Sequence, residues 1–163
     1  MEVVLVQHFL NITEEPLVDR SRFINNFTKY IPQLVSREDN HNLNRPVSEE
    51  EVSDVINEMQ NGKAPDPNGF NVDFFKTRWE IVKQDILDVV EDSRNSKTVL
   101  RVLNASFIAL IPKQEKAMTP EIYRPIALCN VVYKIISKLI ENILKPLLPT
   151  LVSEEKTGYV EGR

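Results

Sequence analysis

The stretch Asn104–Tyr133, NASFIALIPKQEKAMTPEIYRPIALCNVVY, decides the fold that we predict for this chain of 163 residues. It contains two short runs rich in apolar and β-branched residues, Ser106–Ile111 and Ile122–Leu128. A polar connection, Pro112–Glu121, joins them, and this pattern is typical of a β-hairpin. Pro125 lies inside the second run. It predicts an edge position or a bulge there, because proline donates no hydrogen bond to a strand ladder.

Basic residues lie at the edges of the predicted hairpin. Lys113 follows the first run, Arg124 lies inside the second, and Lys116 lies in the connection. Beyond the hairpin, apolar side chains at helical spacing predict a helix over Val131–Leu148. Asn130, directly before it, is a residue type that caps helix N-termini. The stretch therefore predicts a cationic hairpin that leads into a buried helix.

Upstream of the hairpin, a helix is predicted to begin at Ser48. Ser48 and Glu51 match a capping box, and an apolar stripe at helical spacing follows them. The pair Asn61-Gly62 is expected to end this helix in a left-handed cap. The next loop, GKAPDPNGF over residues 62–70, lacks the arrangement of a P-loop. We interpret it as a structural loop, with Lys63 as a candidate contact to a nucleic-acid backbone.

A second helical stretch is predicted over Asn71–Asp92, with a break near Arg78-Trp79. Phe74 and Phe75 belong to its apolar stripe, so we interpret these aromatic side chains as core rather than as a platform for stacking bases. Ser93–Thr98 is predicted to be a polar connection to the hairpin.

Residues 1–46 are predicted to form an arm or linker. Met1–Phe9 and Arg22–Tyr30 have the apolar spacing of short helices. Prolines and the polar run Ser36–Asn44 are expected to interrupt this pattern. Together with the later helices and the hairpin, the pattern predicts an α+β fold that is mostly helical.

The net charge of −4 hides an asymmetry between the two parts of the chain. Residues 1–92 contain 9 basic and 18 acidic side chains, whereas residues 93–163 contain 11 basic and 6 acidic ones. The basic second part suggests an anionic partner, with nucleic acid as the first choice. The alternative is that the two parts neutralise each other across an interface.

Composition limits the compartment and excludes some kinds of site. Cys129 is the sole cysteine, so no intrachain disulfide can form, and an intracellular location is expected without a choice between nucleus and cytoplasm. His8 and His41 are isolated, which excludes the usual Cys/His spacing of metal sites. No apolar run reaches the roughly 18 residues of a membrane span, so no membrane partner is expected.

Six motifs in order point to a known family: GKAPDPNGF, Trp79, LIPK, YRPIALCN, YKIISK and TGYVEGR. The series resembles the first half of the reverse transcriptase domain of non-LTR (LINE-type) retrotransposons, especially those of plants. No single motif carries the resemblance, which covers about Ser48 to Arg163; the order and spacing carry it. The resemblance implies that residues 47–163 form the fingers part of a right-hand polymerase. The catalytic palm would be absent, and the predicted hairpin would be the fingers hairpin.

The resemblance also implies roles for basic residues. In that family, cations of the fingers hold the template backbone and the triphosphate of the incoming nucleotide. Lys113 and Arg124 are the candidates carried over, with Arg163 as a further one, and Lys63 remains a candidate because of its place in the GKAPDPNGF loop. The implied partners are an RNA/DNA template–primer and a dNTP. A guanidinium offers phosphate a planar fork of donors, and lysine offers a point charge. The alternative for each is a solvated surface cation or a local ion pair.

The sequence departs from the family pattern in two places. After KAP the family has GPDG, whereas this chain has Asp66-Pro67-Asn68-Gly69. The aspartate brings a charged side chain to a position where glycine could adopt positive φ freely. Near the end, Lys156-Thr157-Gly158-Tyr159 replaces a pattern with glutamine and Gly-Phe. We interpret both departures as drift in a copy no longer under selection.

The carboxylates needed for nucleotidyl transfer are not found in the motif region. This reaction uses two divalent metal ions held by carboxylates, and the resemblance implies palm aspartates with Mg²⁺ in a full-length relative. Residues 93–163 contain no aspartate. We therefore predict no catalytic residue, metal ligand or cofactor in this chain, and no polymerase activity from it alone. The alternatives are a domesticated nucleic-acid-binding or protein-interaction module and a non-functional remnant.

Overall fold

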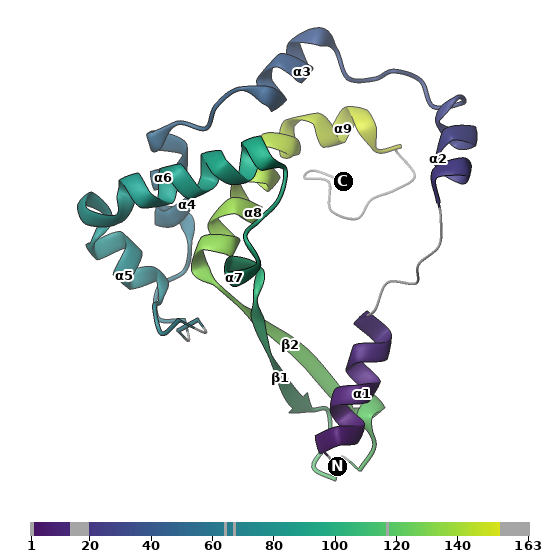
Figure 1. The fold of residues 1–163 in the computed structure, drawn as a ribbon, viewed down its shortest axis with the longest axis vertical. Coiled ribbons are helices and arrows are strands. Elements are labelled where there is room, and N and C mark those ends of the chain that lie inside the picture. Colours follow the sequence, from purple (N-terminus) through teal and green to yellow (C-terminus); the bar gives the residue numbers. More distant parts are fainter. Residues whose placement is uncertain (1, 14–19, 64, 67, 117, 154–163) are drawn as a thin grey trace. The chain divides into compact units, whose positions relative to one another are not determined.

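The structure is a computed structural model that describes residues 2–13, 20–63, 65–66, 68–116 and 118–153 (Figure 1). It is mostly helical, and strands β1 (Ser106–Pro112) and β2 (Tyr123–Cys129) form a two-stranded antiparallel sheet, which confirms the predicted α+β class. Among the helices described, none has the length and apolar character that crossing a membrane requires.

The chain forms two compact units. The smaller unit comprises Met1–Gln33 and Ile108–Ile126, and the larger one comprises Leu34–Phe107 and Ala127–Arg163. The predicted boundary between an arm over residues 1–46 and a domain over residues 47–163 stays a prediction.

The core of the larger unit is built from helices α4 (Glu49–Glu58), α5 (Val72–Thr77), α6 (Trp79–Ser96) and α8 (Val131–Leu144). Helix α4 contacts each of the other three. The buried apolar side chains come from all four helices: Val52, Val55, Ile56, Val72, Phe75, Ile86, Val90, Val131, Ile135, Ile136 and Leu139. Full burial of one such side chain stabilises a fold by about 1.5–3 kcal/mol.

Helix α4 starts as predicted. The Ser48 hydroxyl accepts a hydrogen bond from the Glu51 backbone N–H (3.2 Å), and the Glu51 carboxylate accepts one from the Ser48 backbone N–H (2.9 Å). These two bonds form a capping box, which satisfies backbone donors that have no partner inside the helix. The predicted capping box is confirmed.

The end of α4 differs from the prediction of a left-handed cap at Asn61-Gly62. Gly62 does have a positive φ of 68°, but the helix already ends at Glu58. The Lys76 ammonium, from α5, donates to the carbonyl oxygens of Asn57 (3.0 Å) and Met59 (2.7 Å). Carbonyls at a helix C-terminus need such external donors. A lysine from another helix therefore supplies the hydrogen-bond donors for these carbonyls, which the predicted local cap would otherwise have provided.

Helices α5 and α6 meet at Arg78, where the predicted break is confirmed. The prediction that Ser93–Thr98 forms a polar connection is wrong, because α6 continues to Ser96. Lys97 follows with a φ of 57°, a left-handed conformation that ends a helix. Ser93 is buried within this last part of α6. The first four residues of this polar run, 93–96, therefore belong to a helix that packs against the core.

The aromatic side chains of α5 lie in the core, as predicted. Phe75 is 7% exposed, and Phe74 packs against the buried cluster. The Phe70 ring lies 4.4 Å from the Phe74 ring, centroid to centroid, and extends this aromatic group into the preceding loop.

The polar run Ser36–Asn44 forms a helix, α3 (Arg37–Asn44), so the prediction that it interrupts helical structure is wrong. The Ser36 hydroxyl accepts from the Asp39 backbone N–H (3.0 Å), and the Asp39 carboxylate accepts from the Ser36 backbone N–H (2.9 Å). This second capping box explains how a short and hydrophilic sequence begins a helix. A further short helix that was not predicted, α7 (Arg101–Asn104), precedes β1 and contacts α8.

Helix α8 begins as predicted, with the Asn130 side chain accepting a backbone hydrogen bond from its first turn (3.1 Å). It ends at Leu144 instead of Leu148. Lys145–Leu147 forms a 3₁₀ turn, η2, and α9 (Leu148–Leu151) follows. Pro146 explains this change, because proline has no N–H and its ring collides with the carbonyl of an uninterrupted α-helix.

The smaller unit contains α1 (Glu2–Thr13), α2 (Ser21–Thr28) and the outer part of the hairpin with its 3₁₀ turn η1 (Pro120–Ile122). Both predicted short helices are confirmed. Helix α1 contacts η1 and lies beside the end of the hairpin (Figure 1). A cavity of about 170 Å³ lies between α1 and β1. It is lined by apolar residues of both elements: Leu5, Val6, Phe9, Leu10, Ile108 and Leu110.

Candidate nucleic-acid interface

Two contacts define how the strands of the hairpin pair. The backbone N–H of Lys113 donates to the carbonyl of Ile122 (2.8 Å), next to the connection. At the other end, the Ser106 hydroxyl donates to Cys129 Sγ (3.3 Å). Both contacts fit one antiparallel register without a bulge between them. The predicted strands are thus confirmed, and the position of each side chain across the ladder follows.

This register explains how β2 accommodates Pro125. Hydrogen-bonded and non-hydrogen-bonded pairs alternate along an antiparallel ladder. Since Lys113 and Ile122 form a hydrogen-bonded pair, Pro125 lies opposite Leu110 in a non-hydrogen-bonded pair. At such a position the backbone N–H points away from the partner strand, so proline removes no ladder bond. Both strands of a two-stranded sheet are edges, which agrees with the predicted edge position.

The register also places Lys113 and Arg124 on the same face of the hairpin. Successive side chains of a strand alternate between faces, and Arg124 lies opposite Ile111, two residues before Lys113. Ile111 and Ile126 share this face and are 48% and 42% exposed. Leu110 belongs to the opposite face, which lies toward α1. We call the face of Ile111, Lys113, Arg124 and Ile126 the open face.

Lys113 is partly committed to the hairpin itself. Its ammonium donates to the carbonyl oxygen of Glu121 (2.7 Å) across the start of the connection. The backbone N–H of Glu121 and the Thr119 hydroxyl hold the pKa of the Glu121 carboxyl below its usual value. A lysine ammonium has three N–H donors, so two remain for a ligand after the bond to Glu121.

Arg124 differs from Lys113. Its side chain is exposed, and it makes no hydrogen bond or ion pair within the part of the chain that the structure describes. The guanidinium therefore keeps its five N–H donors in the planar fork that matches two phosphate oxygens. Arg124 therefore has more free N–H donors for a ligand than Lys113, the other cation of the open face.

The other two candidate cations are not part of this face. Lys63 lies in the loop of the larger unit, is exposed, and has no side-chain partner among the described residues. Arg163 lies outside the described residues, as does the departure from the family pattern at residues 156–159. The roles of Lys63 and Arg163 stay predictions.

Asp66 is a buried carboxylate whose importance the sequence analysis missed. It is 8% exposed. One carboxylate oxygen, Oδ1, accepts from the backbone N–H groups of Asn68 (2.9 Å) and Phe70 (3.2 Å). The other, Oδ2, accepts from the backbone N–H of Val131 (3.0 Å), the first residue of α8. One side chain thus orders its own loop and caps the helix that follows the hairpin.

The local part of this arrangement had a signal in the sequence, but the distant part did not. An aspartate with a turn sequence after it commonly binds the backbone two residues on. The bond from Val131, 65 residues away, depends on tertiary packing. The left-handed conformation in this loop falls on Gly69 (φ 83°), so Asp66 needs no backbone conformation reserved for glycine. Asp66 therefore has a structural use in this chain, which our interpretation of this residue as drift did not anticipate.

A metal site would need several carboxylate, histidine or cysteine side chains close together. Within the described ranges, no group of three or more His, Cys, Asp or Glu side chains is placed to hold a metal ion. Asp66 uses both of its oxygens on backbone N–H groups. The carboxylates that the structure describes therefore do not fit the Mg²⁺ site that the resemblance implies for a full-length relative.

Comparison with known proteins gives one informative similarity. The chain is 25% identical over 130 residues to the "Transposon TX1 uncharacterized 149 kDa protein" of Xenopus laevis. The alignment covers 80% of this chain but 10% of that protein. The chain matches no protein-family model. The similarity to a transposon-encoded protein supports a retrotransposon origin for this sequence.

Proposed function

We propose that this chain is the fingers part of a retrotransposon reverse transcriptase, and that the open face of its hairpin binds phosphate. The ligand would be the backbone of a template–primer or the triphosphate of a dNTP. The observation that carries this proposal is that Lys113 and Arg124 share one exposed face. Similarity to a transposon-encoded protein supports it from a second direction, and so does the order of the six sequence motifs.

The geometry suits a phosphate group. Lys113 and Arg124 are diagonal neighbours in the ladder, and the Cα atoms of such neighbours lie roughly 7–8 Å apart. Two long side chains at this separation can reach a single phosphate. Arginine would bind two phosphate oxygens at once, while lysine would add a mobile positive charge. The contact would be independent of base sequence, because phosphates carry no base identity.

Binding is tested by the fluorescence anisotropy of a labelled RNA–DNA primer–template. We expect Arg124→Ala to weaken binding about tenfold, which corresponds to about 1.4 kcal/mol. Lys116→Ala is the matched control, because Lys116 is an exposed cation in the neighbouring connection. It should have a clearly smaller effect. Equal losses from the two substitutions would contradict a specific role for Arg124.

Catalysis is tested separately by primer extension on an RNA template with magnesium or manganese. We expect the 163 residues alone to incorporate no nucleotide, because residues 93–163 contain no aspartate to hold the metal ions that nucleotidyl transfer uses. Incorporation above a buffer blank would contradict this expectation. It would leave the binding test intact.

A further inference from the structure

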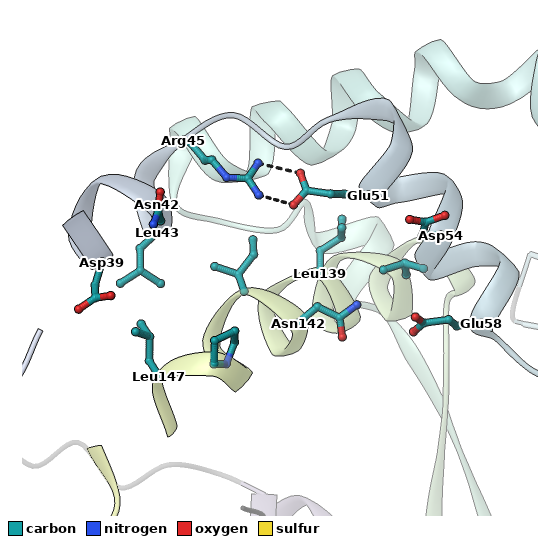
Figure 2. Close-up of a pocket in the computed structure, with 13 residues that line it drawn as sticks. Asp39, Asn42, Leu43, Arg45, Glu51, Asp54, Glu58, Leu139, Asn142 and Leu147 are labelled. Carbon is teal, nitrogen blue, oxygen red and sulfur yellow. Dashed lines mark hydrogen bonds and ion pairs between the residues drawn. The ribbon is translucent and has the colours of Figure 1, made fainter. Parts of the chain in front are cut away.

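A groove with one acidic wall and one apolar wall lies in the larger unit (Figure 2). Its volume is about 530 Å³. Helix α4 supplies the acidic wall through Glu51, Asp54 and Glu58, with Val55 between them. These positions recur at helical spacing, so their side chains share one face of α4. Three of the four residues on that face are acidic.

The facing wall comes from the end of α8 and from η2. Leu139, Ile143, Pro146 and Leu147 supply apolar surface there, and Asn142 adds one amide. Figure 2 shows Leu139 and Asn142 on the helix that faces the carboxylates of α4, and Leu147 on the following turn. The groove therefore offers carboxylates along one side and apolar surface along the other.

The charges of the groove are only partly balanced. Arg45 pairs with Glu51 through two hydrogen bonds of 2.5 and 2.9 Å (Figure 2). Asp39, from α3, accepts a hydrogen bond in its capping box. Asp54 and Glu58 have no hydrogen bond or ion pair with any described residue. Four carboxylates against one guanidinium leave a net charge of −3 among the described lining residues.

Asp54 and Glu58 carry like charges and lie four residues apart on α4. Like charges four residues apart on a helix repel each other and destabilise it by roughly 0.2–0.5 kcal/mol. A cation that lies between the two carboxylates would remove this repulsion. A hydrated inorganic ion would satisfy the carboxylates but not the apolar wall, and nucleic acid would be repelled by the net negative charge. The groove is therefore complementary to a ligand that has both cationic and apolar groups.

We propose that this groove is a docking site for a basic amphipathic peptide segment of a partner protein. Lysine or arginine side chains of the segment would pair with Asp54 and Glu58. Its apolar side chains would lie on Ile143 and Leu147. A volume of about 530 Å³ falls within the range of roughly 300–1,000 Å³ that is typical of ligand pockets. The proposal uses no residue of the open face, so it stands independently of phosphate binding.

The experiment uses the full chain and a fluorescent peptide built from repeated Leu-Lys-Lys-Leu units. Two control peptides separate the contributions: one has glutamate in place of lysine, and the other has serine in place of leucine. We expect the Leu/Lys peptide to bind, and both control peptides to bind at least tenfold more weakly. Added salt should weaken binding of the Leu/Lys peptide, because salt screens exposed charges.

Substitutions locate the binding site. Asp54→Asn combined with Glu58→Gln should weaken peptide binding about tenfold, or about 1.4 kcal/mol. The matched control combines Asp85→Asn with Asp92→Asn, which changes the charge equally at exposed positions of α6 outside the groove. It should leave the affinity unchanged. Leu147→Ser tests the apolar wall without altering charge, and it too should weaken binding.

Three results would overturn the proposal. Equal losses from the two double variants would show attraction to the overall negative charge rather than to the groove. Equal binding of the Leu/Lys peptide and its serine version would show that the apolar wall has no role. Self-association in sedimentation without peptide, abolished by the groove variants, would identify a second copy of this chain as the occupant.

Discussion

Two charged side chains, Asp66 in the larger unit and Arg124 in the smaller one, differ in how much of their hydrogen-bonding capacity the fold uses. Asp66 in the larger unit is 8% exposed, and both of its oxygens accept backbone hydrogen bonds. Arg124 on the hairpin is exposed and has no hydrogen bond or ion pair among the described residues. A buried charge must be paired or hydrogen-bonded to be tolerated, whereas an exposed charge remains hydrated and available. Asp66 is therefore committed to the fold, and Arg124 is available to a ligand.

This difference matches the surroundings of the two residues. Asp66 connects its loop to α8, whose side chains Ile135 and Leu139 are 0% and 4% exposed. Arg124 lies on a two-stranded sheet, next to Ile111, which is half exposed. Substitutions should therefore separate the two regions, with stability changes at Asp66 and binding changes at Arg124.

The largest effect on stability is expected for Asp66→Ala. It removes the acceptor of three backbone N–H groups, including the cap of α8. The bond from Val131 is buried, and those from Asn68 and Phe70 are part-buried. A buried donor left without a partner costs about 1–3 kcal/mol and a more exposed one costs less, so we expect a total loss of about 3 kcal/mol in urea unfolding. Asp66→Asn should lose less, because an amide keeps one acceptor oxygen.

The control for this prediction is Asp85→Ala, which removes an exposed carboxylate of α6 and should change stability by less than about 0.5 kcal/mol. If Asp66→Ala changed stability as little as Asp85→Ala, the hydrogen bonds of Asp66 would not stabilise the fold. Asp66 and Arg124 would then not differ in their structural role. Hydrogen exchange at the Val131 amide offers a local readout, and it should accelerate strongly in Asp66→Ala.

An intermediate effect is expected at Glu51, which is paired but partly exposed. The hydrogen bond from Arg45 is the main cause that lowers the pKa of the Glu51 carboxyl from 4.5 to about 2. Because the folded state favours the ionised carboxylate, its stabilisation is fully present above about pH 4.5 and is lost as the pH falls toward 2. After allowance for solvent screening of an exposed pair, we expect about 1 kcal/mol.

The measurement compares urea unfolding of the wild type and Glu51→Gln near neutral pH and near pH 2.5. The difference between the two proteins should be about 1 kcal/mol near neutral pH and should shrink at low pH, where the wild-type carboxylate takes up protons. A difference that does not depend on pH would show that the ion pair with Arg45 is not the source of the stabilisation.

The smallest effect on stability is expected for Arg124→Ala. The guanidinium makes no described contact that the substitution would break, so thermal unfolding should change by less than about 0.5 kcal/mol. This result would show that any loss of primer–template binding is not caused by unfolding. A large destabilisation would instead place Arg124 among the structural residues and remove the contrast with Asp66.

Local patterns explain which parts of this fold the sequence could predict. The capping box of Ser48 and Glu51, the cap at Asn130 and the two strands depend on residues close together in the chain. Their hydrogen bonds follow from residue type and spacing. Helix α3 had an equally local signal in Ser36 and Asp39, but its polar composition concealed that signal.

Contacts between distant segments could not be predicted in the same way. Lys76 satisfies the end of α4 from another helix, and Asp66 caps α8 across 65 residues. The acidic face of α4 was visible as a spacing of Glu51, Asp54 and Glu58, but nothing in the sequence indicated that an apolar wall faces it. For the open face, the sequence identified Lys113 and Arg124, and the strand register then placed them on the same side.

The most direct test of phosphate binding by the open face is the salt dependence of primer–template affinity. Each cation that contacts a phosphate contributes about 0.7–0.9 to the slope of log K against log salt. We predict that Lys113→Ala combined with Arg124→Ala lowers the magnitude of this slope by about 1.5 and weakens binding at low salt. An unchanged slope and affinity in the double variant, with its fold intact, would contradict the account.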